Sequence, residues 1–203
     1  MSTSSPESSR AVGVHFDGDL QRTLLDAALV ELQDVGAERM SLRGVARRAG
    51  VSHAAPAHHF GDKTGLLTAL AVEGFDSFHG YLRRAHVPVD DPATGLLALG
   101  RSYVEFADRQ PAHFDLIFRR ALIDTADPEY IRAGGASYAA LRDHVEEMQR
   151  LGWHPDEPLL DLTTAVWGLV HGLCSLRSQG ALDATTGEST TDDLLRVAGT
   201  LIV

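Results

Sequence analysis

The chain has one cysteine, few aromatic side chains and no long apolar run. Cys174 is the only cysteine among 203 residues, so we expect neither an internal disulfide nor a thiolate metal cluster, and a reducing compartment fits. No run of 18 or more apolar residues occurs, so we predict no membrane-spanning helix. The Ser-rich start lacks the basic and apolar regions of a secretion signal. We therefore expect a disordered tail over residues 1–15 and a cytoplasmic protein.

Strand signals are also absent from the sequence. No segment alternates strictly between apolar and polar residues, and no Asn-Gly hairpin turn occurs. Apolar residues recur with helical spacing instead, and a hydrophobic content of 44% can fill a buried core. Residues 86–92 contain two prolines and two acids, which favours a boundary there. We predict an all-α protein with domains over residues 16–85 and 93–203.

The helical periodicity predicts the position of most elements. A first helix is expected from a cap near Asp17 or Asp19 to Gly36, with Leu24, Ala28 and Leu32 on its buried face. A later helix should begin at an Asp62 cap and run to about residue 84. Gly134-Gly135 lowers local helix stability, so a kink or hinge is expected there. The further helices are expected over residues 93–108, 111–123, 130–151, 159–178 and 192–203.

Residues 41–67 are the most informative stretch of the chain. Ser41 can cap a short helix, and Gly50 can adopt the left-handed conformation that ends it. Ser52 can cap a second helix, and Pro56 is tolerated in its first turn. The second helix is therefore expected from about Ser52 to about Phe60. Two short helices joined in this way predict a helix-turn-helix for DNA.

The local charge supports DNA binding although the whole chain is acidic. Residues 39–63 carry five cations and one acid, about +4, in a chain of formal net charge −10. An acidic body is repelled by duplex DNA, so affinity requires a concentrated basic surface that displaces counterions from phosphates. The second helix is small and lacks acids, so it can lie flat in a major groove.

In this stretch the chain resembles the TetR family of bacterial regulators. The matching pattern is Leu42-x-x-Val45-Ala46-x-x-Ala49-Gly50-Val51-Ser52, followed by His59-Phe60-x-x-Lys63-x-x-Leu66-Leu67. The chain departs from the family at Ala57, where an aromatic residue that touches the DNA backbone is usual. We hypothesise that His58, or the N–H groups near Asp62 and Lys63, take over that contact.

The motif and the resemblance together give a set of expected DNA-binding residues. Arg43 would reach a base or a phosphate, and His53 and His58 would address base edges. Lys63, with the N-terminus of its helix, would hold a phosphate. The full set is Ser41, Arg43, Ser52, His53, Ala54, Ala57, His58, His59 and Lys63.

The expected helix over residues 159–178 predicts a homodimer. Its apolar residues repeat at alternating spacings of four and three, which is typical of a seam for a partner helix. A second apolar face means that the helix must pack against two neighbouring helices. The same helix of a second subunit is the simplest candidate for the second neighbour. The expected interface residues are Leu162, Val166, Leu169, Leu173 and Leu176, with Leu194 and Leu201 from the last helix.

Trp167-x-x-x-His171-Gly172 resembles the signature of a Trp-His-Gly branch of the same family. The resemblance implies that this helix borders an apolar chamber for a small-molecule effector. The residues expected to line it are Phe114, Phe118, Tyr138, Met148, Trp167 and His171. The same side chains would equally well fill a core. His171 is either a ligand-binding or pH-sensing group or a hydrogen-bonded core residue, and we favour the core.

Other functional classes are weaker. An all-α enzyme would need a nucleophile beside a base, or metal-ligand spacing, and neither occurs. His58 and His59 with Asp62 are disfavoured as a metal site because adjacent helical residues point in different directions. Cys174 is expected to be a small buried hydrophobe rather than a nucleophile. We therefore expect no enzyme activity, no cofactor and no metal.

A second rival is an interaction protein that kept the fold and lost DNA binding. Ala57 and the acidic total motivate it, but residues 39–63 have not accumulated acids. The sequence thus favours a dimeric regulator, expected to be a repressor that binds a nearly palindromic operator. An unidentified small apolar effector is expected to release it by favouring a DNA-incompetent conformation.

Overall fold

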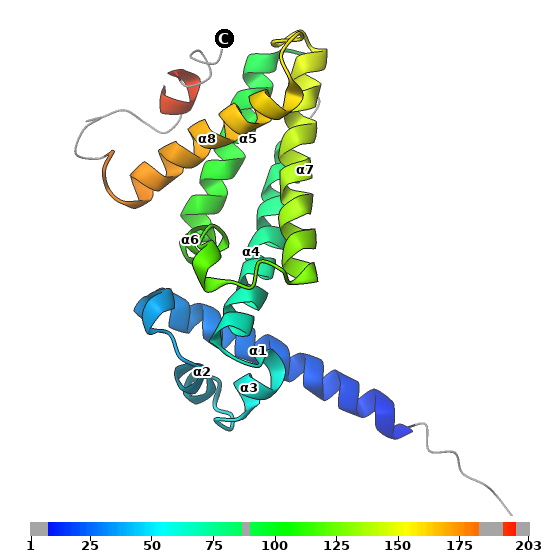
Figure 1. Ribbon diagram of the computed structural model, residues 1–203, viewed down its shortest axis with the longest axis vertical. Helices are drawn as coiled ribbons and strands as arrows, with labels where there is room; N and C mark the ends of the chain where they lie inside the picture. Colours follow the sequence, from blue (N-terminus) through cyan, green and yellow to red (C-terminus); the bar gives the residue numbers. More distant parts are fainter. Residues whose placement is uncertain (1–7, 87–89, 183–192, 198–203) are drawn as a thin grey trace, which may run out of the picture. The chain divides into compact units, whose positions relative to one another are not determined.

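The computed structural model describes residues 8–86, 90–182 and 193–197, with side chains from residue 18 onward, and it is drawn in Figure 1. The described residues contain no strand, which confirms the all-α prediction. The elements are α1 (Ser8–Arg39), α2 (Leu42–Ala49), α3 (Ala55–Phe60), α4 (Lys63–Ala85), α5 (Pro92–Arg109), α6 (Pro111–Ile117), the 3₁₀ turn η1 (Arg120–Leu122), α7 (Pro128–Arg150) and α8 (Leu159–Ser178). Residues 193–197 are also helical.

Two compact units make up the chain. The first comprises Met1–Ala71 with Arg119–Thr125, and the second comprises Val72–Phe118 with Ala126–Val203. This division falls inside α4, whereas the sequence prediction placed it at residues 86–92. It also assigns a short segment from the second half of the chain to the first unit.

The first unit is built on the apolar face of α1. Leu24 and Ala28 are fully buried, as their helical spacing predicts, and so are Val45 of α2 and Leu66 of α4. Burial of one such leucine stabilises the fold by about 1.5–3 kcal/mol. Asp62 caps α4 by accepting the Gly65 N–H at 2.9 Å, as predicted. This core holds α2 and α3 on one side of α1.

The ends of α1 differ in part from the prediction. The helix begins at Ser8, before the expected cap at Asp17 or Asp19 and inside the tail expected to be disordered. At Gly36 the backbone leaves the helical conformation with φ 77°, where the sequence places the helix end. Residues 37–39 then make a further helical turn, because Gly36 can adopt a positive φ that other residues rarely take.

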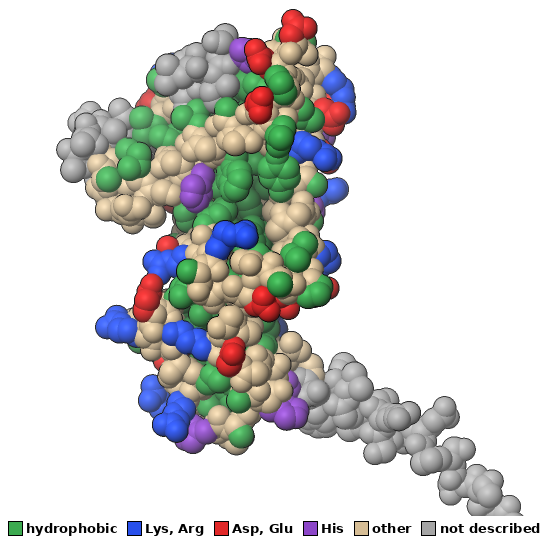
Figure 2. All heavy atoms as spheres, viewed as in Figure 1, with side chains coloured by type: hydrophobic (Ala, Val, Ile, Leu, Met, Phe, Trp, Pro, Cys, Tyr) green, Lys and Arg blue, Asp and Glu red, His purple; other side chains and the backbone are tan. Residues whose placement is uncertain are grey.

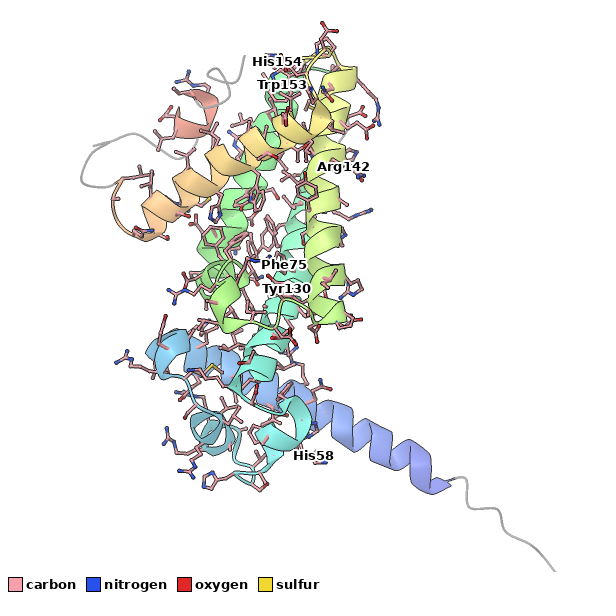
Figure 3. The ribbon with its side chains drawn as sticks, in the orientation of Figure 1. His58, Phe75, Tyr130, Arg142, Trp153 and His154 are labelled. Carbon is pink, nitrogen blue, oxygen red and sulfur yellow. The ribbon has the colours of Figure 1, made fainter. Side chains whose placement is uncertain are left out.

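The second unit packs α6, α7 and α8 against α5. Tyr103 and Phe106 of α5 are fully buried, and the ring centroid of Phe78 lies 4.9 Å from each of theirs. Asp91 caps α5 by accepting the Thr94 N–H at 2.9 Å, and that hydrogen bond lowers the pKa of Asp91. Phe75 and Tyr130, labelled in Figure 3, extend the aromatic packing with ring centroids 5.5 Å apart.

Several predicted helices of this unit need correction. The helix expected over residues 111–123 ends at Ile117, and η1 follows after a break. α7 runs without interruption through Gly134-Gly135, so the expected kink is absent. A Cβ on Gly134 would make an ordinary van der Waals contact with the Phe75 ring at 3.5 Å. α8 spans Leu159–Ser178 as predicted, while of the last expected helix only residues 193–197 are described, and Leu201 lies outside the described residues.

α8 is unusually exposed for its composition. It is long and apolar enough, by length and composition alone, to cross a membrane, which the search for apolar runs in the sequence did not detect. A core helix of a soluble protein passes the same test when it is mostly buried, but only 28% of this apolar window is buried within the chain. Much of the remainder is half-buried, and Leu160 and Leu176 are the large apolar side chains of α8 that are exposed in a single copy.

Replacement of Gly65 by alanine tests the packing at the start of α4. A Cβ at this position would lie 2.0 Å from the Phe60 carbonyl oxygen, so Gly65→Ala should lower the free energy of unfolding by about 1–3 kcal/mol in urea titrations. Gly135→Ala in α7 is the matched control, because its Cβ would meet nothing within 4 Å. The control should be neutral or stabilising by up to about 1 kcal/mol. Equal effects of the two substitutions would contradict the packing described.

Candidate nucleic-acid interface

The first helix of the predicted motif forms as the sequence indicates. Ser41 has an extended backbone, and its side chain accepts the Gly44 N–H at 3.1 Å, so it caps α2. Gly50 ends the helix with φ 68°, and its N–H points to the carbonyl groups of Ala46 and Arg47. α2 is therefore fixed at both ends by the residues that predicted it.

The second helix begins later than predicted. α3 starts at Ala55, and Ser52 lies in a turn in which its carbonyl accepts the Ala55 N–H at 3.1 Å. Ala54 is the residue before the helix, and no side chain caps it. Regular helix geometry begins only beside the buried Pro56, whose fixed φ suits the first turn. His53 and Ala54 therefore project from the turn and not from α3.

The predicted DNA-binding residues lie together on the first unit, and most are exposed. Ser41, Arg43, Ser52, His53, Ala54, Ala57 and His58 are exposed, while His59 and Lys63 are half-buried. Figure 2 shows Lys, Arg and His side chains grouped over the end of the unit that carries α2 and α3. His58, labelled in Figure 3, points away from α3. The grouping supports a DNA-binding surface without showing an individual contact.

The five cations of residues 39–63 divide into three that have a hydrogen-bond or ion-pair partner within the chain and two that have none in its described part. Arg48 forms ion pairs with Glu31 at 2.9 Å and with Asp34 at 2.8 Å, and the hydrogen bond to Glu31 is the main cause of its raised pKa. Arg39 Nε donates to the Val35 carbonyl, and Lys63 Nζ donates to the Glu38 carbonyl at 2.7 Å. In the described part of the chain, no hydrogen bond or ion pair holds Arg43 or Arg47.

The count of five cations in residues 39–63 therefore overstates how many of them are unengaged within the described part of the chain. Arg48, which helical spacing predicts on the outer face of α2, is bound to the acids of α1. Lys63 donates to a backbone carbonyl, and its contact with a phosphate stays a prediction. Arg47, which was not among the predicted DNA-binding residues, is exposed one helical turn from Arg43. Its helical spacing from Arg43 is the signal that could have identified it.

A second cluster lies in the second unit around the predicted chamber residues. The Phe118 ring centroid lies 4.4 Å from that of His171 and 6.2 Å from that of Trp167. Tyr138 also contacts Trp167, with centroids 6.4 Å apart, and Phe114 contacts Phe118 at 5.6 Å. Met148 is buried in α7 and is not part of this ring cluster. The structure thus brings five of the six predicted side chains together.

Tyr103, which the helical spacing of residues 93–108 predicts only as an inward-facing core residue, is the centre of this cluster. Trp167 Nε1 donates to its hydroxyl oxygen at 3.1 Å, and His171 Nδ1 lies 3.1 Å from the same oxygen. His171 Nε2 lies 3.3 Å from Ser175 Oγ. If Tyr103 gives its hydrogen to Nδ1, then Nε2 carries the proton and donates to Ser175.

Burial sets the charge states of this cluster. It lowers the pKa of His171 and raises the pKa of Tyr103. It also raises the pKa of the Cys174 thiol to about 12, so this side chain is protonated at neutral pH. His171 is therefore neutral and hydrogen-bonded, which fits the favoured core interpretation, and Cys174 has the environment of a buried hydrophobe.

The predicted interface residues of α8 have different environments. Leu162 and Val166 are each 7% exposed and belong to the core of one chain. Leu169, Leu173 and Leu194 are half-buried, and Leu176 is 47% exposed. The uncovered stripe of α8 includes the exposed small residues Ala165 and Gly168, the half-buried Gly172 and the predicted Leu176.

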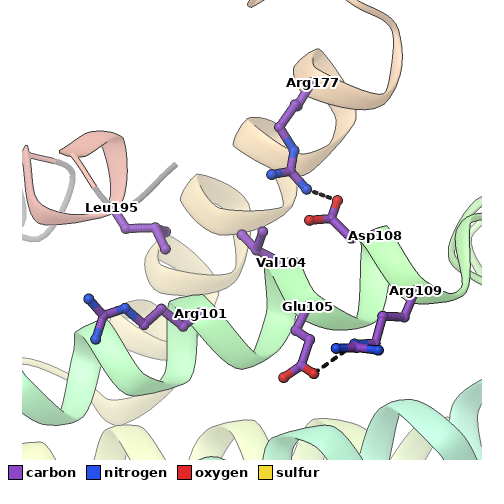
Figure 4. Close-up of a pocket in the computed structure, with 7 residues that line it drawn as sticks. All are labelled: Arg101, Val104, Glu105, Asp108, Arg109, Arg177 and Leu195. Atoms are coloured by element: carbon purple, nitrogen blue, oxygen red, sulfur yellow. Dashed lines mark hydrogen bonds and ion pairs between the residues drawn. The ribbon is translucent and has the colours of Figure 1, made fainter. Parts of the chain in front are cut away.

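A groove that the sequence did not suggest lies on the outer side of α5 (Figure 4). It measures about 420 Å³ and is lined by Arg101, Val104, Glu105, Asp108, Arg109, Arg177 and Leu195. Arg109 pairs with Glu105 at 2.9 Å, and Arg177 pairs with Asp108. Because acids and cations alternate along it, the groove has no strong preference for one sign of charge.

The described fold and its basic surface define a helix-turn-helix protein. Residues 24–70 match the description of bacterial regulatory proteins of the TetR family, and residues 96–198 match that of a tetracyclin repressor-like C-terminal domain. The chain belongs to the TetR family and is a DNA-binding transcriptional regulator, a class without enzyme activity. Regulators of this family bind operator DNA and act as dimers. The narrower Trp-His-Gly branch stays a prediction.

Individual relatives agree with this assignment. A solved protein of unknown function from Rhodococcus sp. RHA1 is 31% identical, with a TM-score of 0.77 over 90% of this chain and 93% of that one. The TetR family regulator PfmR from Thermus thermophilus is 17% identical, with a TM-score of 0.66 over 88% and 96%. The HTH-type transcriptional regulator BetI of Cronobacter sakazakii is 47% identical over 49 residues, 24% of each chain. The match thus spans about a quarter of that curated relative.

Replacement of His58 tests the proposed substitute for the missing aromatic residue. His58→Ala should weaken binding to a selected duplex at least fivefold, because one base or phosphate contact is lost. The melting temperature should not change, since the side chain is exposed. His86→Ala, which removes an exposed histidine of the second unit, is the control. Parental affinity in His58→Ala, measured by fluorescence anisotropy, would exclude the role of His58.

Proposed function

We propose that the protein is a homodimeric repressor that binds a nearly palindromic operator and leaves it when a small apolar effector binds. The single observation that carries the proposal is the exposed surface around Arg43, Arg47, His53 and His58 in a chain of net charge −10. Arg43 and Arg47 form no hydrogen bond or ion pair within the described part of the chain, so they do not help to hold the first unit together. A repressor of this kind would work in the cytoplasm, where the DNA is.

The charge distribution supports specific binding over general adhesion to DNA. The acidic remainder of the chain repels the duplex, so only a docking that presents the basic surface is favourable. Arg43 and Arg47 would neutralise phosphates and release their counterions. The exposed imidazoles of His53 and His58 would then reach base edges, which carry the sequence information.

The uncovered stripe of α8 supports a dimer. Ala165, Gly168 and Gly172 carry little side-chain bulk, so a second helix can approach closely, and Leu176 extends the apolar surface. Burial of such a surface against a second copy is favourable because it removes apolar area from water. Two copies would place two recognition surfaces on one duplex, which predicts half-sites about one helical turn apart.

The aromatic cluster of the second unit supports an effector site. Phe118, Tyr138, Trp167 and His171 are half-buried, and Figure 2 shows hydrophobic side chains recessed between α7 and α8. The polar atoms of Tyr103, Trp167 and His171 already bond to one another, which favours an apolar, uncharged ligand.

The chain path offers a route from this cluster to the DNA-binding unit. Phe118, which contacts His171, is followed directly by the segment Arg119–Thr125 of the first unit. Within that unit Arg119 pairs with Glu38, and the Asp124 N–H donates to Thr68 Oγ1 at 3.0 Å. An effector that binds the DNA-incompetent state more tightly would shift this segment, and DNA would weaken the effector by the same factor.

Selection of bound sequences from a random duplex pool tests the proposed function. The selected sequence should be nearly palindromic, and the logarithm of the binding constant should fall steeply with the logarithm of salt concentration. That duplex then serves to screen apolar compounds for release. Weak binding without sequence preference would contradict the repressor proposal.

Replacement of Gly168 tests the proposed dimer surface. Gly168→Glu should leave the fold intact, because a Cβ there would meet nothing within 4 Å, but a charge on the stripe should separate the subunits. Sedimentation at micromolar concentration should show monomers, with weaker operator binding. Gly135→Glu on the exposed side of α7 is the matched control and should stay dimeric. A dimeric Gly168→Glu protein would place the interface elsewhere.

A further inference from the structure

The first unit contains a buried acid that the DNA-binding motif by itself does not explain. Glu31 lies on the inner face of α1 and is only 5% exposed. Its Oε2 accepts two hydrogen bonds from Arg48 of α2, at 3.1 Å from Nε and 2.9 Å from Nη2. Arg48 also reaches Asp34, one turn along α1. A buried carboxylate is tolerated only when it is paired in this way.

The other carboxylate oxygen of Glu31 explains a glycine in the first turn of α2. A Cβ built on Gly44 would lie 2.1 Å from Glu31 Oε1, so any larger residue would displace the carboxylate. Glycine in a helix interior lowers stability by about 1 kcal/mol relative to alanine. Gly44, Glu31 and Arg48 therefore form one arrangement, in which the backbone of α2 rests directly on the acid.

We propose that Glu31 and Arg48, seated on Gly44, are positioning residues that fix the rotation of α2 against α1 and so direct Arg43 and Arg47 at the DNA. Arg48 is adjacent to Arg47 in the chain, yet its guanidinium is turned to α1. The ion pair thus separates two neighbouring arginines into one that holds the helix and one that stays exposed.

The geometry of α2 explains why the different directions of Arg47 and Arg48 matter for DNA binding. Arg43 and Arg47 are four residues apart and share one face of the helix, while Arg48 is rotated by about 100° from Arg47. If the Glu31 contact is lost, α2 can rotate, and only the molecules that hold the native rotation can bind. The affinity then falls by that fraction, while the bound complex keeps the phosphate contacts of both arginines. The role rests on the DNA-binding function, and it makes no use of the effector or of the dimer.

A double-mutant cycle tests the arrangement without DNA. Gly44→Ala alone should lower the melting temperature, because the new Cβ collides with Glu31. In the Glu31→Ala background the same Gly44→Ala substitution should raise the melting temperature, because the collision is gone, only Ser41 Oγ lies near the new Cβ at 3.2 Å, and alanine favours helix. If Gly44→Ala shifts the melting temperature in the same direction in the wild type and in the Glu31→Ala variant, the proposed contact between Glu31 and Gly44 is wrong.

Matched substitutions of the neighbouring arginines test the role in binding. Arg47→Met should weaken binding to the selected duplex and reduce the magnitude of the salt slope by about 1, as loss of one phosphate contact does. Arg48→Met should weaken binding at least fivefold with the salt slope unchanged. Glu31→Gln should act like Arg48→Met, and the double variant should bind no worse than either single variant. Circular dichroism must show each variant folded at the assay temperature.

Two results with a DNA-binding wild type would overturn the positioning role alone. Folded Arg48→Met and Glu31→Gln proteins with affinities within twofold of the wild type would show that the pair serves only stability. A smaller salt slope in Arg48→Met, equal to that of Arg47→Met, would show that Arg48 contacts a phosphate itself. A wild type that binds no duplex at low salt would overturn the regulatory function and this role together.

Discussion

The DNA-binding unit depends on an electrostatic constraint: an acidic chain must keep its acids away from the surface that meets a polyanion. Glu31 is turned inward onto Arg48, and Glu38 pairs with Arg119. The backbone N–H of Glu38, followed by Arg119, lowers the pKa of that carboxyl. Asp62 accepts a backbone N–H at the start of α4. The acids nearest the motif are thereby engaged, and the exposed arginines of α2 set the local potential.

The second unit packs aromatic side chains together although several of them, including Phe118 and Trp167, stay half-buried. Tyr103 joins α5 to α8 through the hydrogen bonds of Trp167 and His171, so these polar atoms are satisfied among aromatic rings. α8 contributes Leu162 and Val166 to that core while it leaves its small-residue stripe exposed. One helix thus serves the interior of the chain and carries the surface that we propose for a second copy.

The sequence predicted those features of the fold that depend on neighbouring residues. Ser41, Gly50 and Asp62 act within one helical turn of their own positions, and their conformations follow from local chemistry. The bounds of α8 followed from its apolar periodicity. The start of α3 was misplaced, because Ser52 is equally suited to a cap and to the turn that it forms, and the difference depends on how Pro56 packs.

Features that depend on distant residues could not be predicted. The partner of Arg48 is 17 positions away in the chain, so the sequence alone made Arg48 look like a free cation. Gly44 is explained chiefly by Glu31, which is 13 positions away in the chain and whose Oε1 would lie 2.1 Å from a Cβ there. Residues 119–125 belong to the first unit through contacts with α1 and α4. Tyr103 was read as core because helical spacing does not show which buried hydroxyl is hydrogen-bonded.

The central claim is that two copies of this chain present their α2 and α3 surfaces to one face of a duplex. Hydroxyl-radical footprinting of the selected duplex, with the mass of the complex measured in parallel, tests it most directly. The account predicts two protected patches on the same face, about one helical turn apart, and two chains per duplex. A single patch with one chain bound, or uniform protection along the duplex, would contradict it.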